Sequence, residues 1–121
     1  MSQAQNHHAI NYIEFAATDV AAAKKFYSTI FGWSFTDYGP DYASFDANAA
    51  GLAGGFYKAD LHAPHPKTAP LVVLYSVDLS ATEKAVIAAG GKIVVPTFEF
   101  PGGRRFHVED GVGNALAVWS E

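Results

Sequence analysis

Glu14, Arg105 and His107 are the side chains of this sequence best suited to chemistry on a small molecule. Glu14 lies in the middle of an apolar stretch, residues 9–17, where an unpaired carboxylate is costly to desolvate. Burial there would suit Glu14 to general acid/base catalysis. The alternative role for Glu14 is a structural ion pair with Arg105.

Arg105 and His107 are two positions apart, so they share one face of the strand predicted over residues 104–109. The planar guanidinium of Arg105 can bind a carboxylate or phosphate through two parallel hydrogen bonds. Otherwise it neutralises a glutamate of the chain: Glu14, Glu99 or Glu109. His107 can act as a base, donate a hydrogen bond to a ligand, or serve as a core histidine bonded to the backbone.

A repeat in the sequence supplies the elements that position these side chains. Asp19, Lys25 and Gly32 recur 59 residues later as Asp78, Lys84 and Gly91. Each copy has an apolar strand, a helix preceded by Asp, a glycine and further strands. A duplicated half-domain must pair with its sibling to bury its apolar face, and the seam between the halves is a natural place for a concave site.

Periodicity and capping residues predict the element order βαβββ twice, an α+β class. Asp19 is a good N-cap for a helix over residues 20–31, and Gly32 ends it. For the second helix, either Asp78 or a Ser80–Glu83 capping box marks the start. The predicted strands are 9–17, 33–38, 42–45, 52–58, 71–77, 92–96, 104–109 and 115–120, with 46–51 as a loop and 98–101 left open. The strand over 71–77 is expected to be buried.

The composition predicts one domain, residues 1–121, with two modules of about 9–59 and 70–120. The Pro-rich connector is residues 60–69. There is no cysteine, so no thiolate or disulfide chemistry is possible. The net charge of −4 disfavours nucleic acid as a partner, and no apolar run is long enough to span a membrane. We therefore expect a cytoplasmic protein that handles a small molecule.

The sequence resembles the vicinal oxygen chelate superfamily of glyoxalases, bleomycin resistance proteins and extradiol dioxygenases. The similarity lies in ATDVAAAKKFYSTIFGW (17–33), VDLSATEKAVIAAGGKIV (77–94) and EDGVGNALAVW (109–119). The resemblance implies a single glyoxalase/bleomycin resistance-like domain, whose two βαβββ modules form a half-open barrel around a pocket. It also implies a homodimer.

Enzymes of this superfamily hold a divalent metal through His, Gln or Glu side chains. Carried over to this chain, the ligand positions fall on Tyr12, Leu71, Ala117 and the strand containing Gly54 and Gly55. Tyrosine, leucine, alanine and glycine are not a ligand set for a divalent ion. We therefore expect no metal site of the family type and no cofactor.

Strand alternation then predicts which side chains line the pocket. If Tyr12 and Ala117 point inward, as the resemblance implies, the residues that share their faces also point inward. The predicted ligand-binding residues are Tyr12, Tyr75, Arg105 and Trp119, and the predicted catalytic residues are Glu14 and His107. Phe106 and Val108 are expected on the helix-covered side.

Three functions are compatible with this lining. The first is a metal-free small-molecule binding protein in the manner of bleomycin resistance proteins. The second is a metal-independent lyase or isomerase that uses Glu14 and His107 as acid and base. The third is a metal-dependent enzyme of the glyoxalase or dioxygenase type, with Glu14 and His107 as substitute ligands.

Overall fold

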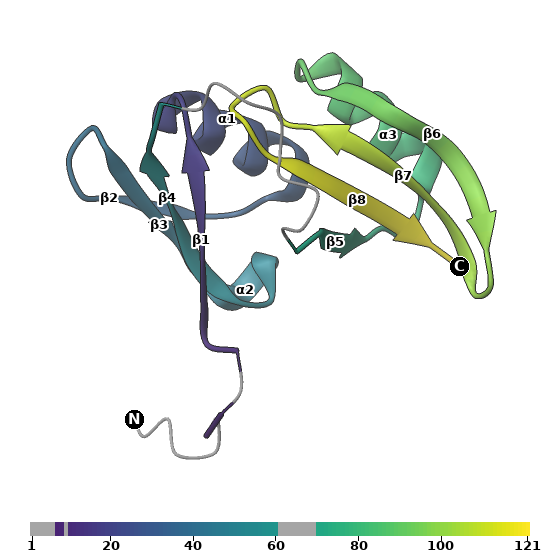
Figure 1. Cartoon of the computed structure of the whole chain (residues 1–121), viewed down its shortest axis with the longest axis horizontal. Helices are drawn as coiled ribbons and strands as arrows, with labels where there is room; N and C mark the ends of the chain where they lie inside the picture. Colours follow the sequence, from purple (N-terminus) through teal and green to yellow (C-terminus); the bar gives the residue numbers. More distant parts are fainter. Residues whose placement is uncertain (1–6, 9, 61–69) are drawn as a thin grey trace.

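The computed structural model describes residues 7–8, 10–60 and 70–121. Most of the expected connector, 60–69, therefore lies outside the described residues. The strands form two separate four-stranded sheets (Figure 1). Each sheet is built from one of the two ranges that the repeat predicts, and the division into modules remains our proposal.

The first sheet has the strand order β1-β4-β3-β2, with β1 and β4 parallel and the other neighbours antiparallel. Its elements are β1 (Tyr12–Ala17), α1 (Val20–Phe31), β2 (Phe35–Asp37), β3 (Tyr42–Phe45), α2 (Ala47–Ala50) and β4 (Ala53–Lys58). The predicted helix boundaries are confirmed. The Asp19 carboxylate accepts a hydrogen bond from the Ala22 backbone N–H, and Gly32 ends the helix with a φ of 73°.

The second sheet repeats this topology in the order β5-β8-β7-β6. Its elements are β5 (Val72–Tyr75), α3 (Leu79–Ala88), β6 (Lys92–Phe100), β7 (Gly103–Glu109) and β8 (Ala115–Ser120). Asp78, not the Ser80–Glu83 capping box, caps α3, because its carboxylate accepts from the Ala81 N–H. The fold is α+β, and its two sheets form a half-open barrel because they do not close on each other.

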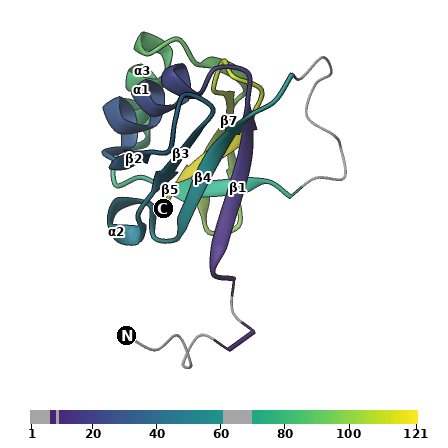
Figure 2. The same cartoon turned by 90° about the vertical axis from the view of Figure 1, so that its left-hand side faces the viewer.

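Helices α1 and α3 lie next to each other where the two halves meet (Figures 1 and 2). The strand faces that look toward the helices are buried. They carry Phe15, Phe56, Phe106, Val108, Leu116 and Val118, each less than 9% exposed. The prediction that Phe106 and Val108 face the helix-covered side is confirmed. The opposite face of the first sheet is called here the first open face, and the opposite face of the second sheet is called the second open face.

Three expectations about elements are wrong in detail. The stretch 71–77 forms only the short strand β5, and Val73 and Tyr75 are 43% and 49% exposed, because β5 is an edge strand with one open face. The expected loop 46–51 contains α2. Strand β6 runs unbroken from residue 92 to 100, and register shifts beside Pro96 accommodate its missing N–H.

The halves are joined by a buried polar group in the turn between β7 and β8. The Asp110 carboxylate, 4% exposed, accepts hydrogen bonds from the Tyr27 hydroxyl (2.7 Å) and from the side-chain amide of Asn114 (3.1 Å). The same amide donates to the Ala16 carbonyl of β1 at 2.8 Å. This turn therefore fixes the second sheet against the first.

Candidate functional site

Arg105 is held on the second open face by two aromatic rings of the neighbouring strand. Its guanidinium carbon lies 5.3 Å from the ring centre of Phe98 and 5.6 Å from that of Phe100, both on β6. On its other side, Arg105 is the cross-strand partner of Trp119 on β8. Cation–π attraction of this kind stabilises a guanidinium by roughly 0.5–2 kcal/mol and restricts its orientation.

Two nitrogen atoms on this face are buried without a hydrogen-bond partner in the described part of the chain. They are Nε of Arg105 and Nε2 of His107. A buried nitrogen that makes no hydrogen bond costs about 1–3 kcal/mol, so such atoms are commonly satisfied by a ligand or water. Burial, and then the positive charge of Arg105, lower the pKa of His107, so its imidazole is neutral near pH 7.

Trp119 and Tyr75 form the aromatic wall beside Arg105. Their ring centroids are 5.0 Å apart at 71°, and the Tyr75 hydroxyl donates to Glu121 at 2.6 Å. Val73, Phe100, Arg105 and Trp119 line a pocket of about 190 Å³, called here the arginine pocket. An apolar wall with one fixed cation is the usual composition of a small-molecule site.

The first open face carries a different group, centred on Tyr42. The Tyr42 hydroxyl donates to Oε2 of Glu14 at 3.0 Å and is also hydrogen-bonded to the hydroxyl of Tyr12. Burial is the main factor that raises the pKa of Tyr42, and the hydrogen bonds to Tyr12 and Glu14 raise it further. Tyr12 and Tyr42 also line a second pocket, of about 480 Å³.

The predicted site residues thus fall into two groups. Tyr75, Arg105, His107 and Trp119 share the second open face, whereas Tyr12 and Glu14 share the first. Glu14 is exposed, because the strand face that carries it is open, so the burial that would suit it to acid/base catalysis is not present in this chain.

The alternative ion pair between Glu14 and Arg105 is not formed either. Within the described residues, the ion pair that the structure contains joins Lys24 to Asp37 at 2.6 Å. The partner of Glu14 is instead a phenol, and the partners of Arg105 are aromatic rings.

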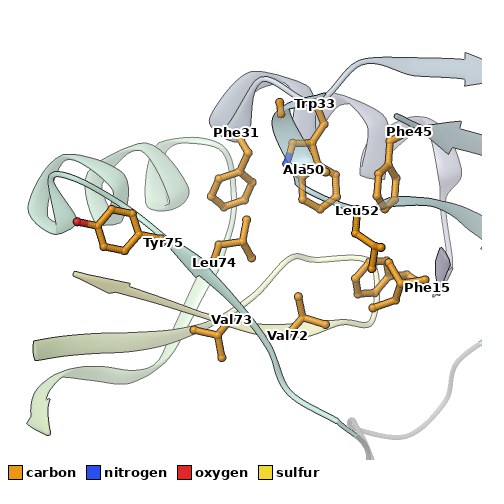
Figure 3. Close-up of a pocket in the computed structure, with 12 residues that line it drawn as sticks. Phe15, Phe31, Trp33, Phe45, Ala50, Leu52, Val72, Val73, Leu74 and Tyr75 are labelled. Atoms are coloured by element: carbon orange, nitrogen blue, oxygen red, sulfur yellow. The ribbon is translucent and has the colours of Figure 1, made fainter. Parts of the chain in front are cut away.

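A third pocket, of about 370 Å³, lies at the seam between the halves (Figure 3). Phe31, Trp33 and Phe45 of the first half face Val72 and Leu74 of β5 across it. No His, Arg, Lys, Asp or Glu side chain lines this pocket. Without such a side chain the pocket has no group that could fix an ionic ligand, so it is a weaker candidate for chemistry than the two open faces.

The metal-ligand positions implied by the family resemblance do not hold a donor set. The Tyr12 hydroxyl is bonded to Tyr42, and the cross-strand neighbours of Ala117 are Val73 and His107. One imidazole nitrogen is too few donors for a divalent ion. Across residues 7–8, 10–60 and 70–121, no cluster of three or more His, Cys, Asp or Glu side chains could hold a metal.

Sequence reasoning missed Tyr42, Phe98 and Phe100. Their contacts depend on register, because Tyr42 reaches Glu14 only where Gly55 of β4 leaves room for its ring between β1 and β3. The alternation of Phe98 and Phe100 beside a basic strand was an available signal. Because the pairing of β6 with β7 contains register shifts, the sequence does not indicate which rings lie against Arg105.

Comparison with known proteins gives a consistent family match. The family model described as Glyoxalase/Bleomycin resistance protein/Dioxygenase superfamily matches residues 9–118. A relative described as "Putative glyoxylase CFP32", from Mycobacterium bovis and Mycobacterium tuberculosis, is 30% identical over 90% of this chain. The chain spans only 44% of that relative's length.

Solved structures share the fold at low identity. A glyoxalase-related enzyme from Fulvimarina pelagi aligns with a TM-score of 0.75 and 19% identity, covering 94% of this chain and 88% of its own. A lactoylglutathione lyase from Agrobacterium tumefaciens aligns with a TM-score of 0.66 and 19% identity, covering 93% of each chain. None of the described helices has the length and apolar character needed to cross a membrane.

Proposed function

Because the chain belongs to the glyoxalase/bleomycin resistance protein/dioxygenase superfamily, we propose that it is a metal-free small-molecule binding protein. Its ligand is an organic anion with an aromatic or apolar body. The proposed ligand-binding residues are Tyr75, Arg105 and Trp119, with His107 beside them. In this proposal the protein is cytoplasmic and works as a homodimer.

The observation that carries the proposal is the unpartnered Nε of Arg105 beside the arginine pocket. A guanidinium that lies over the rings of Phe98 and Phe100 cannot turn freely toward solvent, so its N–H groups, including the unpartnered Nε–H, are already oriented. A carboxylate in the pocket would accept from them in the bidentate geometry that arginine favours. Trp119 would stack on the apolar body of the ligand.

The test is calorimetric titration with 1-naphthoate and with its neutral relative, 1-naphthalenemethanol. We expect the carboxylate to bind at least tenfold more tightly. We expect Arg105→Gln to remove that preference, because a hydrogen bond between charged groups contributes about 1.5–3 kcal/mol. Arg104→Gln is the matched control, since Arg104 is the next residue of β7 and points to the opposite face.

Two further variants test whether the ligand lies in the arginine pocket or beside Glu14. Trp119→Ala should weaken naphthoate binding more than Glu14→Gln, because Trp119 lines the arginine pocket and Glu14 does not. The proposal is wrong if both ligands bind equally well, or if Arg104→Gln and Arg105→Gln have the same effect.

A second candidate is a metal-independent lyase or isomerase, with His107 and Glu14 as acid and base. The lowered pKa of His107 favours it, since a neutral imidazole with a free nitrogen can accept a proton at pH 7. The location of Glu14 on the other open face weighs against a joint role within one chain. Metal-dependent chemistry ranks last, because the donor set does not fit.

Turnover of lactoylglutathione, which appears in the name of the Agrobacterium tumefaciens neighbour, is the first activity to assay. Under the enzyme hypothesis, Glu14→Gln abolishes turnover and leaves ligand affinity within a few fold. An activity that Glu14→Gln and His107→Gln both leave unchanged would contradict acid/base catalysis by these residues.

A further inference from the structure

The pocket on the first open face has a composition opposite to that of the arginine pocket. Three tyrosines, Tyr12, Tyr38 and Tyr42, line it together with the carboxylate-bearing Asp46. Its remaining lining residues are Thr36, Ser44, Phe45 and Ala53. It is called here the tyrosine pocket, and it shares no residue with the arginine pocket.

Glycine at position 55 allows the central ring to lie against the sheet. A Cβ atom at Gly55 would overlap the hydroxyl end of Tyr42, so the ring occupies the space that a larger residue would fill. Gly55 is the cross-strand partner of both Glu14 and Ser44. The Tyr42 ring therefore crosses the face of β4 toward β1.

The hydrogen bonds among Tyr12, Tyr42 and Glu14 do not neutralise the carboxylate of Glu14. The single hydroxyl proton of Tyr42 is donated to Glu14, so the hydroxyl of Tyr12 is the donor in its bond with Tyr42. The raised pKa of Tyr42 keeps its phenol neutral at physiological pH. Glu14 thus accepts from a neutral donor, and no Lys, Arg or His lines the pocket.

The aromatic rings are arranged as walls and do not stack on one another. The ring centroids of Tyr38 and Tyr42 are 6.2 Å apart, and the ring planes are inclined by 53°. Tyr38 is 66% exposed, so one wall is open to an entering ligand. Inclined tyrosine faces beside a carboxylate attract an organic cation through cation–π and Coulomb interactions.

We propose that the tyrosine pocket binds an organic ammonium ion, with Tyr38 and Tyr42 against its alkyl groups and Asp46 as the carboxylate that lines the pocket. Glu14 does not line the pocket but is hydrogen-bonded to its Tyr42, and it adds negative charge beside it. A metal ion suits the pocket less well, because neutral phenols are poor ligands and only two carboxylates are near. An anion would meet the charge of Glu14. The inference does not depend on the ligand proposed for the arginine pocket, since within one chain the two pockets are on different sheets.

The test compares choline with 3,3-dimethylbutan-1-ol, in which carbon replaces the charged nitrogen and the shape is kept. Titrations followed by NMR should show choline binding at least tenfold more tightly at low ionic strength, where exposed charges are screened least. Glu14→Gln should reduce choline affinity severalfold and leave the affinity for the neutral alcohol unchanged. Glu83→Gln, a carboxylate change on α3, is the matched control and should have no effect.

A second variant covers the case in which Glu14→Gln disturbs folding. Tyr38→Ala removes an exposed ring, and we expect it to weaken choline binding without a change in thermal unfolding. Equal binding of choline and its carbon relative, or choline binding that survives both variants, would overturn the inference. Unchanged binding of 1-naphthoate to Glu14→Gln would show that Glu14 affects the tyrosine pocket and not the arginine pocket.

Discussion

At the level of single residues, the two open faces differ in charge. The second carries the guanidinium of Arg105 among aromatic rings, and the first carries Glu14 beside phenols. Both charges lie on strands whose other face is apolar core. We therefore expect each face to favour a ligand of the opposite charge.

His107 should make the stability of the protein depend on pH. Its pKa is lowered in the folded state, so the unfolded chain binds a proton more readily as the pH falls below about 6.5. The contribution of neutral His107 is complete above that pH and is lost as the pH falls through the folded-state pKa. His107→Gln should therefore lose less stability than the wild type between pH 7.5 and 5, measured by urea unfolding.

The control for this prediction is His8→Gln, because His8 is exposed near the N-terminus. We expect its stability to follow the wild type across the same pH range. An identical pH dependence of the wild type and His107→Gln would contradict the assignment.

Alanine substitutions at the two adjacent glycines of β4 should lower the stability of the protein by different amounts. A Cβ at Gly54 would overlap the backbone carbonyl of Ile13, which cannot move without breaking the sheet, whereas the atoms nearest a Cβ at Gly55 belong to the hydroxyl end of the Tyr42 side chain. We expect Gly54→Ala to lower the free energy of unfolding by more than about 2 kcal/mol, and Gly55→Ala by clearly less.

Gly55→Ala should instead weaken choline binding, because it displaces Tyr42 from Glu14. Urea unfolding and choline titration of both variants separate the two effects. Equal losses of stability in the two variants would contradict the prediction.

The chemistry of individual residues was only partly predictable from the sequence. Strand alternation correctly indicates that Arg105 and His107 lie opposite the buried faces of Phe106 and Val108. It does not indicate partners, because those depend on register across strands that are distant in sequence. The pairing of Glu14 with Tyr42, and not with Arg105, is a consequence of register and could not be predicted.

At the level of elements, the boundaries of α1 were predictable, whereas the short helix α2 and the length of the edge strands were not. Asp19 and Gly32 are local signals, since caps act on the backbone groups next to them. Strand β5 is short and half exposed because its neighbours are on one side only, a property of the sheet and not of residues 71–77. The strand predicted over 92–96 continues to residue 100 as β6, because an edge strand tolerates Pro96.

The contact between α1 and the β7–β8 turn gives a prediction at this level. The Tyr27 hydroxyl is fully buried and donates to Asp110, and burial, followed by that carboxylate, raises the pKa of Tyr27. Tyr27→Phe leaves the carboxylate with one donor fewer, so we expect the free energy of unfolding to fall by about 1–3 kcal/mol. The measurement is urea unfolding followed by tryptophan fluorescence.

Tyr57→Phe is the control for this change, because Tyr57 is 43% exposed and lies on the first open face. Its effect should be within about 0.5 kcal/mol of the wild type. Equal effects of the two tyrosine variants would mean that the bond between the halves adds no stability.

For the whole molecule, the repeat accounts for the architecture. Two copies of βαβββ give two sheets with the same strand order, and α1 and α3 meet between them. The family match over residues 9–118 covers both copies. The same symmetry leaves two open faces, each with apolar side chains that the described residues leave exposed: Tyr12 and Tyr57 on the first, Val73 and Tyr75 on the second.

These open faces favour the homodimer that the resemblance implies. The first carries Glu14 and Asp46 and the second carries Arg105, so the faces of two copies are complementary in charge. A twofold axis would place each first open face against the second open face of the other copy, forming both contacts at once. Burying the exposed apolar side chains contributes about 25 cal/mol for each Å² removed from water. We therefore predict a dimer at micromolar concentration.

Sedimentation equilibrium of the wild type should give twice the chain mass, and Val73→Asp should give the mass of one chain. Val77→Asp is the matched control, because Val77 is 89% exposed and follows β5, so a charge there is tolerated in either state. A monomeric wild type, or dissociation by Val77→Asp as complete as by Val73→Asp, would contradict the predicted interface. In that case each pocket must bind its ligand on a face open to solvent, with correspondingly weaker electrostatic attraction.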